Sequence, residues 1–291
     1  MLELRLAKHS IIGGITVNIG FIGAGRVGCS LGAYLLDNGF LVSGYFSRSY
    51  ESVCIAAELV KTKPYDNLLE LVNDCDLIFV TVNDGAIANV CNELRNCNLH
   101  NKILCHTSGA MSSKVFEDLE GVGGIGSLHP LMAVSSRTHA LGSAFFTIEG
   151  NDIGINVLRD ILNKCGNPYQ AIDSGNKTKY HLAAATASNL VVGLLDMSIN
   201  ILTDCGFTNE SALAALKPLV EGNAAAVMDM GARKALTGPV SRGDFGTVKK
   251  HLDNLEGEDR EIYRLLSRRL MKLSSYSETD IENDMKGILE E

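Results

Sequence analysis

A short glycine-rich turn, Gly23–Gly28, has the residue types and spacing to bind phosphate groups. Its sequence is Gly-Ala-Gly-Arg-Val-Gly, and it lies between an apolar run that begins at Ile15 and an amphipathic segment. In a strand–turn–helix unit, the first glycine permits the tight turn, the second lets a pyrophosphate approach the backbone, and the third lets helix and strand pack closely. Free N–H groups at the helix start then face the phosphates. The sequence predicts a dinucleotide-binding turn, with a plain tight turn as the alternative.

The next strand is expected at 40–46, and the residues that follow it distinguish between NAD and NADP. An Asp or Glu at this place would bind the adenosine ribose 2′-hydroxyl of NAD. The sequence has Ser47 and Arg48 instead. A hydroxyl and a guanidinium suit a 2′-phosphate, so we expect NADP (NADPH) as the cofactor. The alternative is that Arg48 is a solvated loop residue without a ligand.

Two further strands, expected at 76–83 and 102–108, extend the predicted cofactor site. In a doubly wound sheet the ligand lies across the carboxyl ends of the strands. The predicted cofactor-binding residues are Gly23, Ala24, Gly25, Arg26, Val27, Gly28, Ser47, Arg48, Thr81, Val82, Asn83, Thr107, Ser108 and Gly109. A second GxGxxG pattern at 121–126 runs into Ser-Leu-His-Pro and not into a helix. We therefore interpret it as a glycine loop that leads to a strand.

Two histidines are candidates for proton transfer. His129 ends the strand that follows the second glycine pattern, and His181 lies on one face of a long apolar helix together with Ser188, with Asn189 at its margin. The ordinary pKa of histidine lies near neutral pH, so His181 is the first candidate and His129 the second. Ser188 and Asn189 are expected to orient a substrate. The alternatives are a His129 that caps a loop and a helix face that forms a helix–helix or subunit interface.

Arg242 is the candidate for binding an acidic group of the substrate. It precedes a helix that is expected at 245–255 and for which Asp244 is a good N-cap. A guanidinium beside free N–H groups forms an anion site. The alternative is a capped turn in which Arg242 pairs with Asp244.

The expected elements place these residues in two domains. Strands and helices alternate up to residue 172, and the nearly continuous apolar run at 76–83 is typical of a parallel strand covered on both faces. From 176 onward the periodicity is helical, starting with one helix over 176–204 and a second over 211–230 that Pro218 bends or splits. We therefore expect an α/β fold, with a doubly wound, mainly parallel Rossmann sheet followed by an all-α domain. The expected parts are an N-terminal extension at 1–14, an NADP-binding domain at 15–174 and a helical substrate and dimerisation domain at 175–291.

The composition narrows the class of protein. A net charge of −8 over 291 residues argues against binding of nucleic acid or anionic membranes. The stretch 182–202 has the length of a membrane span but contains two Asn and one Asp, so a buried central helix is the prediction. Because one small helical domain does not readily bury such a helix, we also expect a homodimer. The eight cysteines lack CxxC spacing, which favours reduced thiols in the cytoplasm, and no metal-ligand spacing occurs.

Several motifs occur together: the glycine turn, Ser47-Arg48, Ser-Leu-His-Pro at 127–130, the segment from Tyr180-His181 to Ser188-Asn189, and Thr-Gly-Pro-Val-Ser-Arg-Gly-Asp at 237–244. From Ile15 to about Tyr276 the chain resembles the family that joins a Rossmann-like domain to a C-terminal domain of unknown function 2520. That family is related in architecture to 6-phosphogluconate dehydrogenase, ketopantoate reductase, pyrroline-5-carboxylate reductase and the coenzyme F420-dependent NADP reductases.

The resemblance implies an NADP-dependent oxidoreductase with a 6-phosphogluconate-dehydrogenase-like helical domain. It would transfer a hydride between NADP(H) and a small carbonyl, imine or hydroxy acid in the cleft between the domains. Hydroxyacid dehydrogenases and ketopantoate reductase place a Lys on the long helix and an Asn one turn later. Here the comparable face offers His181, with Lys177 one turn earlier as a possible substitute and Asn189 eight residues on. The alternative function is a non-catalytic NADP(H)-binding sensor or scaffold.

Overall fold

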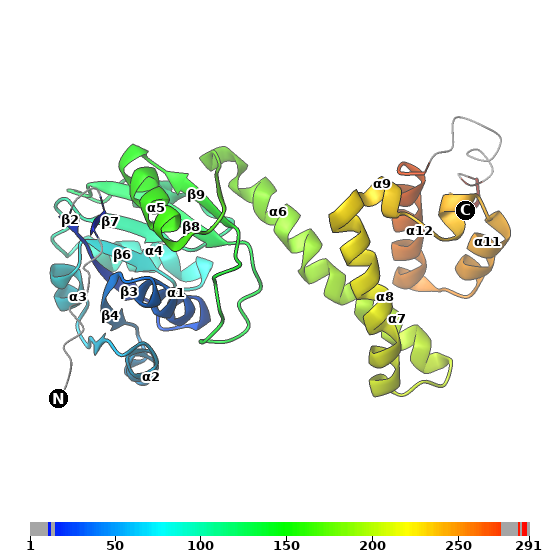
Figure 1. Cartoon of the computed structure of the whole chain (residues 1–291), viewed down its shortest axis with the longest axis horizontal. Coiled ribbons are helices and arrows are strands. Elements are labelled where there is room, and N and C mark those ends of the chain that lie inside the picture. Colours follow the sequence, from blue (N-terminus) through cyan, green and yellow to red (C-terminus); the bar gives the residue numbers. More distant parts are fainter. Residues whose placement is uncertain (1–10, 13–14, 275–284, 286, 290–291) are drawn as a thin grey trace. The chain divides into compact units, whose positions relative to one another are not determined.

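The computed structural model of the protein describes residues 11–12, 15–274, 285 and 287–289. The chain divides into two compact units, 1–188 and 189–291, which are coloured from blue to green and from green to red in Figure 1. Most of the expected N-terminal extension and of the charged tail after Ser277 lies outside the described residues. Within the described part of the extension, β1 (Ile11–Ile12) pairs with β2 (Ile15–Thr16) in an antiparallel ladder.

The first unit is built on a mainly parallel sheet, which has eight strands in the described residues. Across the sheet the strand order is β10-β9-β8-β7-β6-β3-β4-β5. The strands are β3 (Asn18–Ile22), β4 (Leu41–Phe46), β5 (Lys63–Pro64), β6 (Leu77–Val80), β7 (Ile103–His106), β8 (Gly124–Pro130), β9 (Phe146–Gly150) and β10 (Tyr169–Ala171). From β5 across to β8 all neighbours are parallel. This is the order of the doubly wound nucleotide-binding fold, in which the chain changes direction between β3 and β6, and it confirms the expected fold class.

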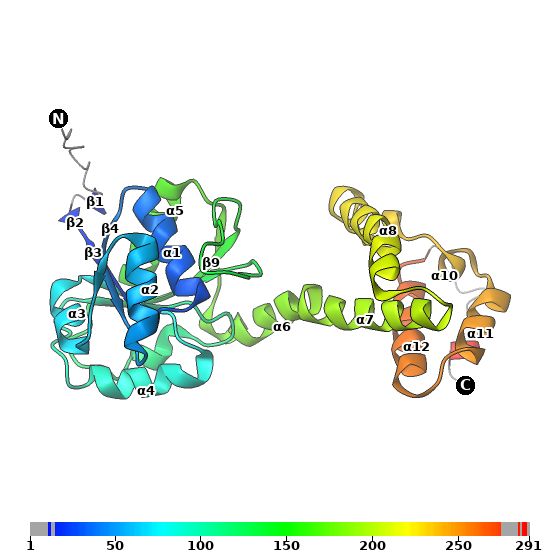
Figure 2. The same ribbon diagram turned by 90° about the horizontal axis from the view of Figure 1, so that it is seen from below.

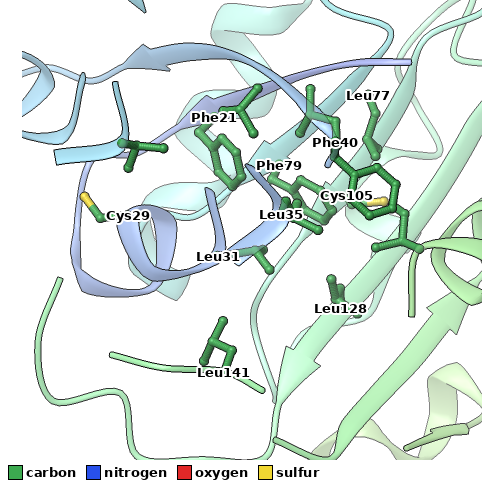
Figure 3. Packing of buried hydrophobic residues seen from close by; sticks show 14 of the residues in the cluster. Phe21, Cys29, Leu31, Leu35, Phe40, Leu77, Phe79, Cys105, Leu128 and Leu141 are labelled. Carbon is green, nitrogen blue, oxygen red and sulfur yellow. The ribbon is translucent and has the colours of Figure 1, made fainter. Parts of the chain in front are cut away.

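Helices cover both faces of this sheet. The helices are α1 (Arg26–Asp37), α2 (Tyr50–Val60), α3 (Leu68–Asp74), α4 (Asp84–Leu94) and α5 (Asp152–Cys165), with a short 3₁₀ helix η1 (Ser113–Phe116). Buried side chains of α1, α2 and α5 share one core cluster with the sheet, and those of α3, α4 and η1 share another. Figure 3 shows the first cluster, in which the rings of Phe21 and Phe79 stack with centroids 5.5 Å apart. The two clusters bury the strands on both faces, which explains their apolar sequences.

The sheet reverses direction between β8 and β9. These strands pair antiparallel, with Pro130 opposite Phe146, so residues 131–145 form a hairpin loop at the carboxyl end of β8. Leu141 in this loop is fully buried in the first core cluster (Figure 3). The Asn167 side chain donates hydrogen bonds to the carbonyl oxygens of Leu141 and Ala144, both at 3.1 Å. The loop is therefore a packed part of the domain.

The expected helix over 176–204 is interrupted, so the prediction of one continuous helix was wrong. After a 3₁₀ turn η2 (Ser174–Asn176), α6 spans Lys177–Ala187 and α7 spans Asn189–Asp204. Between them Ser188 has φ −122° and ψ −77°, outside the helical region. Just before the break, the Thr186 hydroxyl donates to the Leu182 carbonyl at 2.7 Å, a contact that bends helices. Thr, Ser and Asn are also weak helix formers, which fits a break at this point.

The prediction of a buried central helix was also wrong for the chain by itself. Leu182 is 63% exposed and Val192 is 67% exposed. Among the described residues, the helical stretch 174–204 is long and apolar enough to cross a bilayer, and the apolar window within it is 0% buried. Length and composition are the basis of that finding, and core helices of soluble proteins share both. The sequence identified the apolar surface but could not tell what covers it.

The second unit is helical. It contains α7, α8 (Asn209–Met230), α9 (Ala232–Ala235), α10 (Pro239–Arg242), α11 (Phe245–Asp253) and α12 (Gly257–Met271). Helix α8 runs through Pro218 without a break. Figure 2 shows α10, α11 and α12 side by side, and Val240, Val248 and Leu252 form their buried core together with Met285 and Leu289.

Candidate functional site

The glycine turn between β3 and α1 is closed on one side and open on the other. Gly23 has φ +118°, which favours glycine, and a Cβ atom there would lie 2.8 Å from the Thr81 carbonyl. A Cβ at Gly28 would lie 2.5 Å from both the Gly23 carbonyl oxygen and the Thr81 hydroxyl. At Gly25, by contrast, a Cβ would meet no atom within 4 Å. Gly23 and Gly28 are therefore required by packing, whereas Gly25 faces open space where a ligand can approach.

The first turn of α1 suits an anion. Its N-cap, Gly25, offers no side-chain hydrogen bond to the free N–H groups, and no acidic residue lies in the first turn. The partial positive charge of the helix start is thus left for a ligand. Twelve residues of helix contribute to it. A dinucleotide pyrophosphate fits this turn, both in the space at Gly25 and in the sign of the charge.

A cavity of about 560 Å³ adjoins the turn, a volume in the usual range for small-molecule sites. Ser47 and Arg48, in the loop from β4 to α2, line it, and no carboxylate follows β4 before Glu51. The predicted cofactor residues in its wall are Gly23, Ala24, Gly25, Ser47, Arg48, Thr81, Val82 and Asn83. The predicted residues Arg26, Val27, Gly28, Thr107, Ser108 and Gly109 are not in the wall. Arg26 donates instead to the Ser135 carbonyl at 3.5 Å.

A second guanidinium, that of Arg137, also lines this cavity. Arg137 is not among the predicted cofactor residues, because it lies 89 positions after Arg48 in the hairpin loop 131–145. The Ser30 hydroxyl of α1 donates to the Ser136 carbonyl at 3.1 Å and accepts from the His139 N–H at 3.1 Å. The loop is thereby fastened to the second turn of α1 on both sides of Arg137. Its only sequence signal is a single basic residue in a Ser- and Thr-rich stretch.

A buried polar network lies behind the carboxyl end of β7. The Lys177 ammonium group donates to the Ser108 carbonyl oxygen and to the Ser127 hydroxyl, both at 2.7 Å. Ser108 in turn donates to the Asp84 carboxylate at 2.8 Å. Lys177 is 1% exposed, and this burial lowers its pKa to about 8, although the negative charges of Glu149 and Asp84 oppose the shift. Lys177 thus joins α6 to the sheet through a charge that is costly to bury.

Two histidines meet in front of Gly109. A Cβ built on Gly109 would lie 2.8 Å from His181 Nδ1 and 2.9 Å from His129 Nε2, so both nitrogens approach the same point. The other nitrogen of His129, Nδ1, is 2.7 Å from the Tyr180 hydroxyl. In the described residues no group of three potential ligands could hold a metal ion here or elsewhere.

Burial keeps the His129 imidazole and the Tyr180 hydroxyl uncharged at neutral pH. Burial, reinforced by the positive charge of Lys177, lowers the pKa of His129 to about 4. Burial raises the pKa of Tyr180, so its hydroxyl keeps its proton at neutral pH. A phenol that donates to Nδ1 leaves the imidazole proton on Nε2, which faces Gly109. With Tyr180 as the donor, neutral His129 presents its N–H at Nε2, and the exposed His181 lies on the other side of the same point.

Next to this pair lies a fully buried histidine, His106, at the end of β7. Its Nδ1 accepts a hydrogen bond from the Ser108 N–H at 3.2 Å. Its Nε2 has no hydrogen-bond partner among the described residues. Burial lowers its pKa to about 4, so His106 is neutral in the folded protein at physiological pH.

The remaining predicted residues lie at the end of the first unit and in the second. Ser188 is exposed at the end of α6, and Asn189 is exposed at the start of α7. Arg242 is exposed at the end of α10. Asp244 caps α11 as expected, accepting from the Thr247 N–H at 3.0 Å and from its hydroxyl at 2.8 Å. These bonds lower the pKa of Asp244, and the charge of Arg242 adds to the shift without a salt bridge between the two in the described residues.

Comparison with known protein families gives two successive matches along the chain. A Rossmann-like domain model matches residues 7–130, and the model of the domain of unknown function 2520 (DUF2520) matches residues 144–270. The second match thus begins within the sheet, at β9 and α5. No protein of curated function matches the chain at a significant level.

Solved structures with the same fold include oxidoreductases. BF3122 of Bacteroides fragilis, a proposed NADP oxidoreductase, is 23% identical with a TM-score of 0.72, covering 88% of this chain and 98% of its own. Protein TM1727 of Thermotoga maritima is 28% identical with a TM-score of 0.69 and the same coverage, 88% and 98%. Pyrroline carboxylate reductase of Plasmodium falciparum, solved with NADP bound, is 16% identical with a TM-score of 0.58, covering 94% and 96%. Identities of this size indicate a shared fold. With its two domain matches, the chain belongs to the family that joins a Rossmann-like domain to a DUF2520 domain.

Proposed function

We propose that the protein is an NADP(H)-dependent oxidoreductase that acts on a small carbonyl or imine compound with an acidic group. The observation that carries the proposal is the cavity beside the open Gly25, whose wall holds Ser47 and Arg48 where an NAD-binding protein would place a carboxylate. The likeness in fold to NADP oxidoreductases supports the same cofactor class.

The cofactor half of the proposed site is formed by backbone N–H groups and by the side chains that follow β4. The N–H groups at the start of α1 receive the pyrophosphate, and Thr81 keeps the turn in shape through its hydrogen bond to the Gly23 carbonyl at 2.8 Å. Ser47 and Arg48 bind the 2′-phosphate. When bound, NADPH supplies the hydride for reduction of the substrate.

The chemical half uses the histidine pair at Gly109. His181 gives up or accepts the proton that accompanies hydride transfer, since it is exposed and its Nδ1 faces the same point as His129 Nε2. His129, held neutral by burial and by Lys177, donates a hydrogen bond from Nε2 that orients a substrate oxygen or nitrogen. Lys177 positions both by tying α6 to Ser108 and Ser127. Ser188 and Asn189 are proposed to orient the substrate, and Arg242 to bind its acidic group.

The proposal is tested in two steps. Titration of protein fluorescence or NADPH fluorescence measures the affinity for NADPH, and a panel of 2-keto acids and cyclic imines then identifies a compound whose reduction consumes it. Pyrroline carboxylate belongs in the panel, because the Plasmodium protein of the same fold is named for its reduction. His181→Ala is expected to lower turnover by about 10²- to 10⁴-fold, the usual contribution of general acid–base catalysis.

A surface variant, His100→Ala, is the matched control and is expected to keep full turnover. Arg242→Gln is expected to raise KM for acidic substrates more than it lowers kcat, as loss of a binding contact does. Unchanged turnover of His181→Ala would contradict its proton-transfer role. Tight NADPH binding without oxidation by any compound of the panel would favour a sensor or scaffold, and failure to bind NADPH would contradict both functions.

A further inference from the structure

The hairpin loop 131–145 brings a cation to the cofactor cavity that is not part of the nucleotide-binding turn itself. Arg137 is half-buried and lines the same cavity as Gly25 and Arg48. Its positive charge also acts on the thiol of Cys29 in the first turn of α1, where it opposes the rise in pKa caused by burial. The guanidinium therefore lies near the start of the helix, where the pyrophosphate is expected.

This guanidinium has no anionic partner of its own. Within residues 11–12, 15–274, 285 and 287–289, Arg137 forms neither a hydrogen bond nor a salt bridge, and the same holds for Arg48. Glu93 is the only carboxylate in the described wall of the cavity. A chain with net charge −8 thus places two uncompensated guanidinium groups in one cavity, which is the arrangement expected of a site for an anion with several charges.

The loop is fastened so that Arg137 stays at this place. Ser30 bonds to the backbone on both sides of it, at Ser136 and His139, each at 3.1 Å. Ser30 is 2% exposed and Leu141 is fully buried, so a free swing of the loop would break buried contacts. A side chain fixed in this way loses little freedom when a ligand binds, which favours affinity.

We propose that Arg137 binds the pyrophosphate of the dinucleotide, across from the N–H groups of α1, and that Ser30 is the residue that positions it. The proposal rests on the proposed function, since it assigns a further contact to the same cofactor. Arg48 and Arg137 then have different roles. Arg48 recognises the 2′-phosphate and distinguishes NADPH from NADH, whereas Arg137 contacts a group that both dinucleotides carry.

The division of roles is tested by titrating NADPH and NADH against the full-length protein and three variants. Arg137→Gln is expected to weaken the binding of both dinucleotides by the same factor, about 10- to 100-fold, the usual value of a charge-assisted hydrogen bond. Arg48→Gln is expected to weaken NADPH binding by a similar factor and to leave NADH binding unchanged. Arg159→Gln, which removes an exposed Arg of α5, is the charge-matched control and is expected to change neither.

Three outcomes would contradict the assignment. Unchanged affinity of Arg137→Gln for both dinucleotides would show that Arg137 does not contact the cofactor. Loss of NADPH affinity alone would place Arg137 at the 2′-phosphate. An equal loss of dinucleotide affinity in Arg159→Gln would show that the effect of Arg137→Gln comes from the change in net charge. Failure of the unaltered protein to bind either dinucleotide would instead contradict the proposed function, so the two failures are distinguishable.

The role of Ser30 is tested by a double-mutant cycle with Ser30→Ala. If Ser30 acts through Arg137, Ser30→Ala weakens binding of both dinucleotides in the unaltered background and has no further effect in Arg137→Gln. If Ser30→Ala lowers the affinity by the same factor in the unaltered protein and in Arg137→Gln, the positioning role is overturned. Equal factors mean that Ser30→Ala acts independently of Arg137, for example through a general effect on folding. The melting temperature of each variant, measured without ligand, identifies any such general effect.

Discussion

The three glycines of the turn give the sharpest prediction, because the structure assigns opposite reasons to two of them. Gly28 is needed by packing, since a Cβ would lie 2.5 Å from the Gly23 carbonyl oxygen and from the Thr81 hydroxyl. Gly25 is not, since a Cβ there meets nothing within 4 Å and its φ of −85° suits any residue. Gly28→Ala is therefore expected to destabilise the protein, and Gly25→Ala is expected to affect binding alone.

The magnitudes follow from these distances. Overpacking at Gly28 should cost about 1–3 kcal/mol, which lowers the melting temperature by roughly 2–12 °C for a domain of this size. At Gly25, a weaker N-cap costs up to about 1 kcal/mol, and the lower entropy of the unfolded chain offsets about 0.4–1 kcal/mol, so the melting temperature should stay within roughly 2 °C. A methyl group at the open position keeps phosphate oxygens from the N–H groups, and loss of one such bond should weaken NADPH binding at least about tenfold.

Differential scanning fluorimetry without ligand and a fluorescence titration with NADPH measure the two quantities separately. Gly25→Ala with unchanged stability and unchanged NADPH affinity would refute the placement of the pyrophosphate at this turn. Equal losses of stability in Gly25→Ala and Gly28→Ala would refute the distinction between an open and a closed side. In either case the error would lie in the geometry of the turn.

Three further predictions concern titration and assembly. Folded His106 stays neutral down to about pH 4, whereas the residue in the unfolded chain takes up a proton below pH 6.5. The stability that comes from keeping His106 neutral is therefore fully present above pH 6.5 and is lost as the pH falls toward 4. Between pH 7 and pH 5 the protein should therefore lose about 2 kcal/mol more unfolding free energy than His106→Leu in urea titrations, and equal losses would show that His106 does not titrate in this way. Burial lowers the pKa of Lys177 from 10.5 to about 8, so between these pH values the unfolded state binds more protons and the unfolding free energy rises with pH. In Lys177→Met this rise should be smaller by about 2 kcal/mol between pH 8 and pH 10. The same pH dependence in the variant and the unaltered protein would contradict the prediction. Because Leu190, Val192 and Met228 are 60%, 67% and 83% exposed, we expect a homodimer in sedimentation experiments, which a monomer at micromolar concentration would contradict.

The parts of the fold that depend on neighbouring residues were predictable from the sequence. The turn at Gly23–Gly28, the strand before it and the helix after it form one local unit, and the apolar run expected as a strand at 76–83 contains β6 (Leu77–Val80). The cap at Asp244 is equally local, since its partner is Thr247. Such features need no knowledge of the rest of the chain.

The parts that depend on distant residues were not predictable. Arg137 reaches the cavity because β9 runs antiparallel to β8 and because Ser30, more than one hundred positions earlier, holds the loop. The burial of Lys177 results from the partners Ser108 and Ser127, which nothing in the local sequence identifies. The apolar composition of residues 182–202 predicted a buried helix, but composition does not specify which other surface packs against that helix.

The reversal of the sheet at β9 also bears on how this protein could be altered. A right-handed crossover after β8 would carry the chain away from the cofactor edge, whereas the hairpin returns directly from Pro130 to its register partner Phe146. Both ends of the loop are thus fixed by one rung of the ladder, and the exposed positions between them, such as Ala133 and Thr138, can be exchanged without disturbing a buried contact. Exposed positions of segment 131–140 beside Arg137, and not Arg137 or the two residues held by Ser30, are therefore the place to introduce new cofactor or substrate preferences.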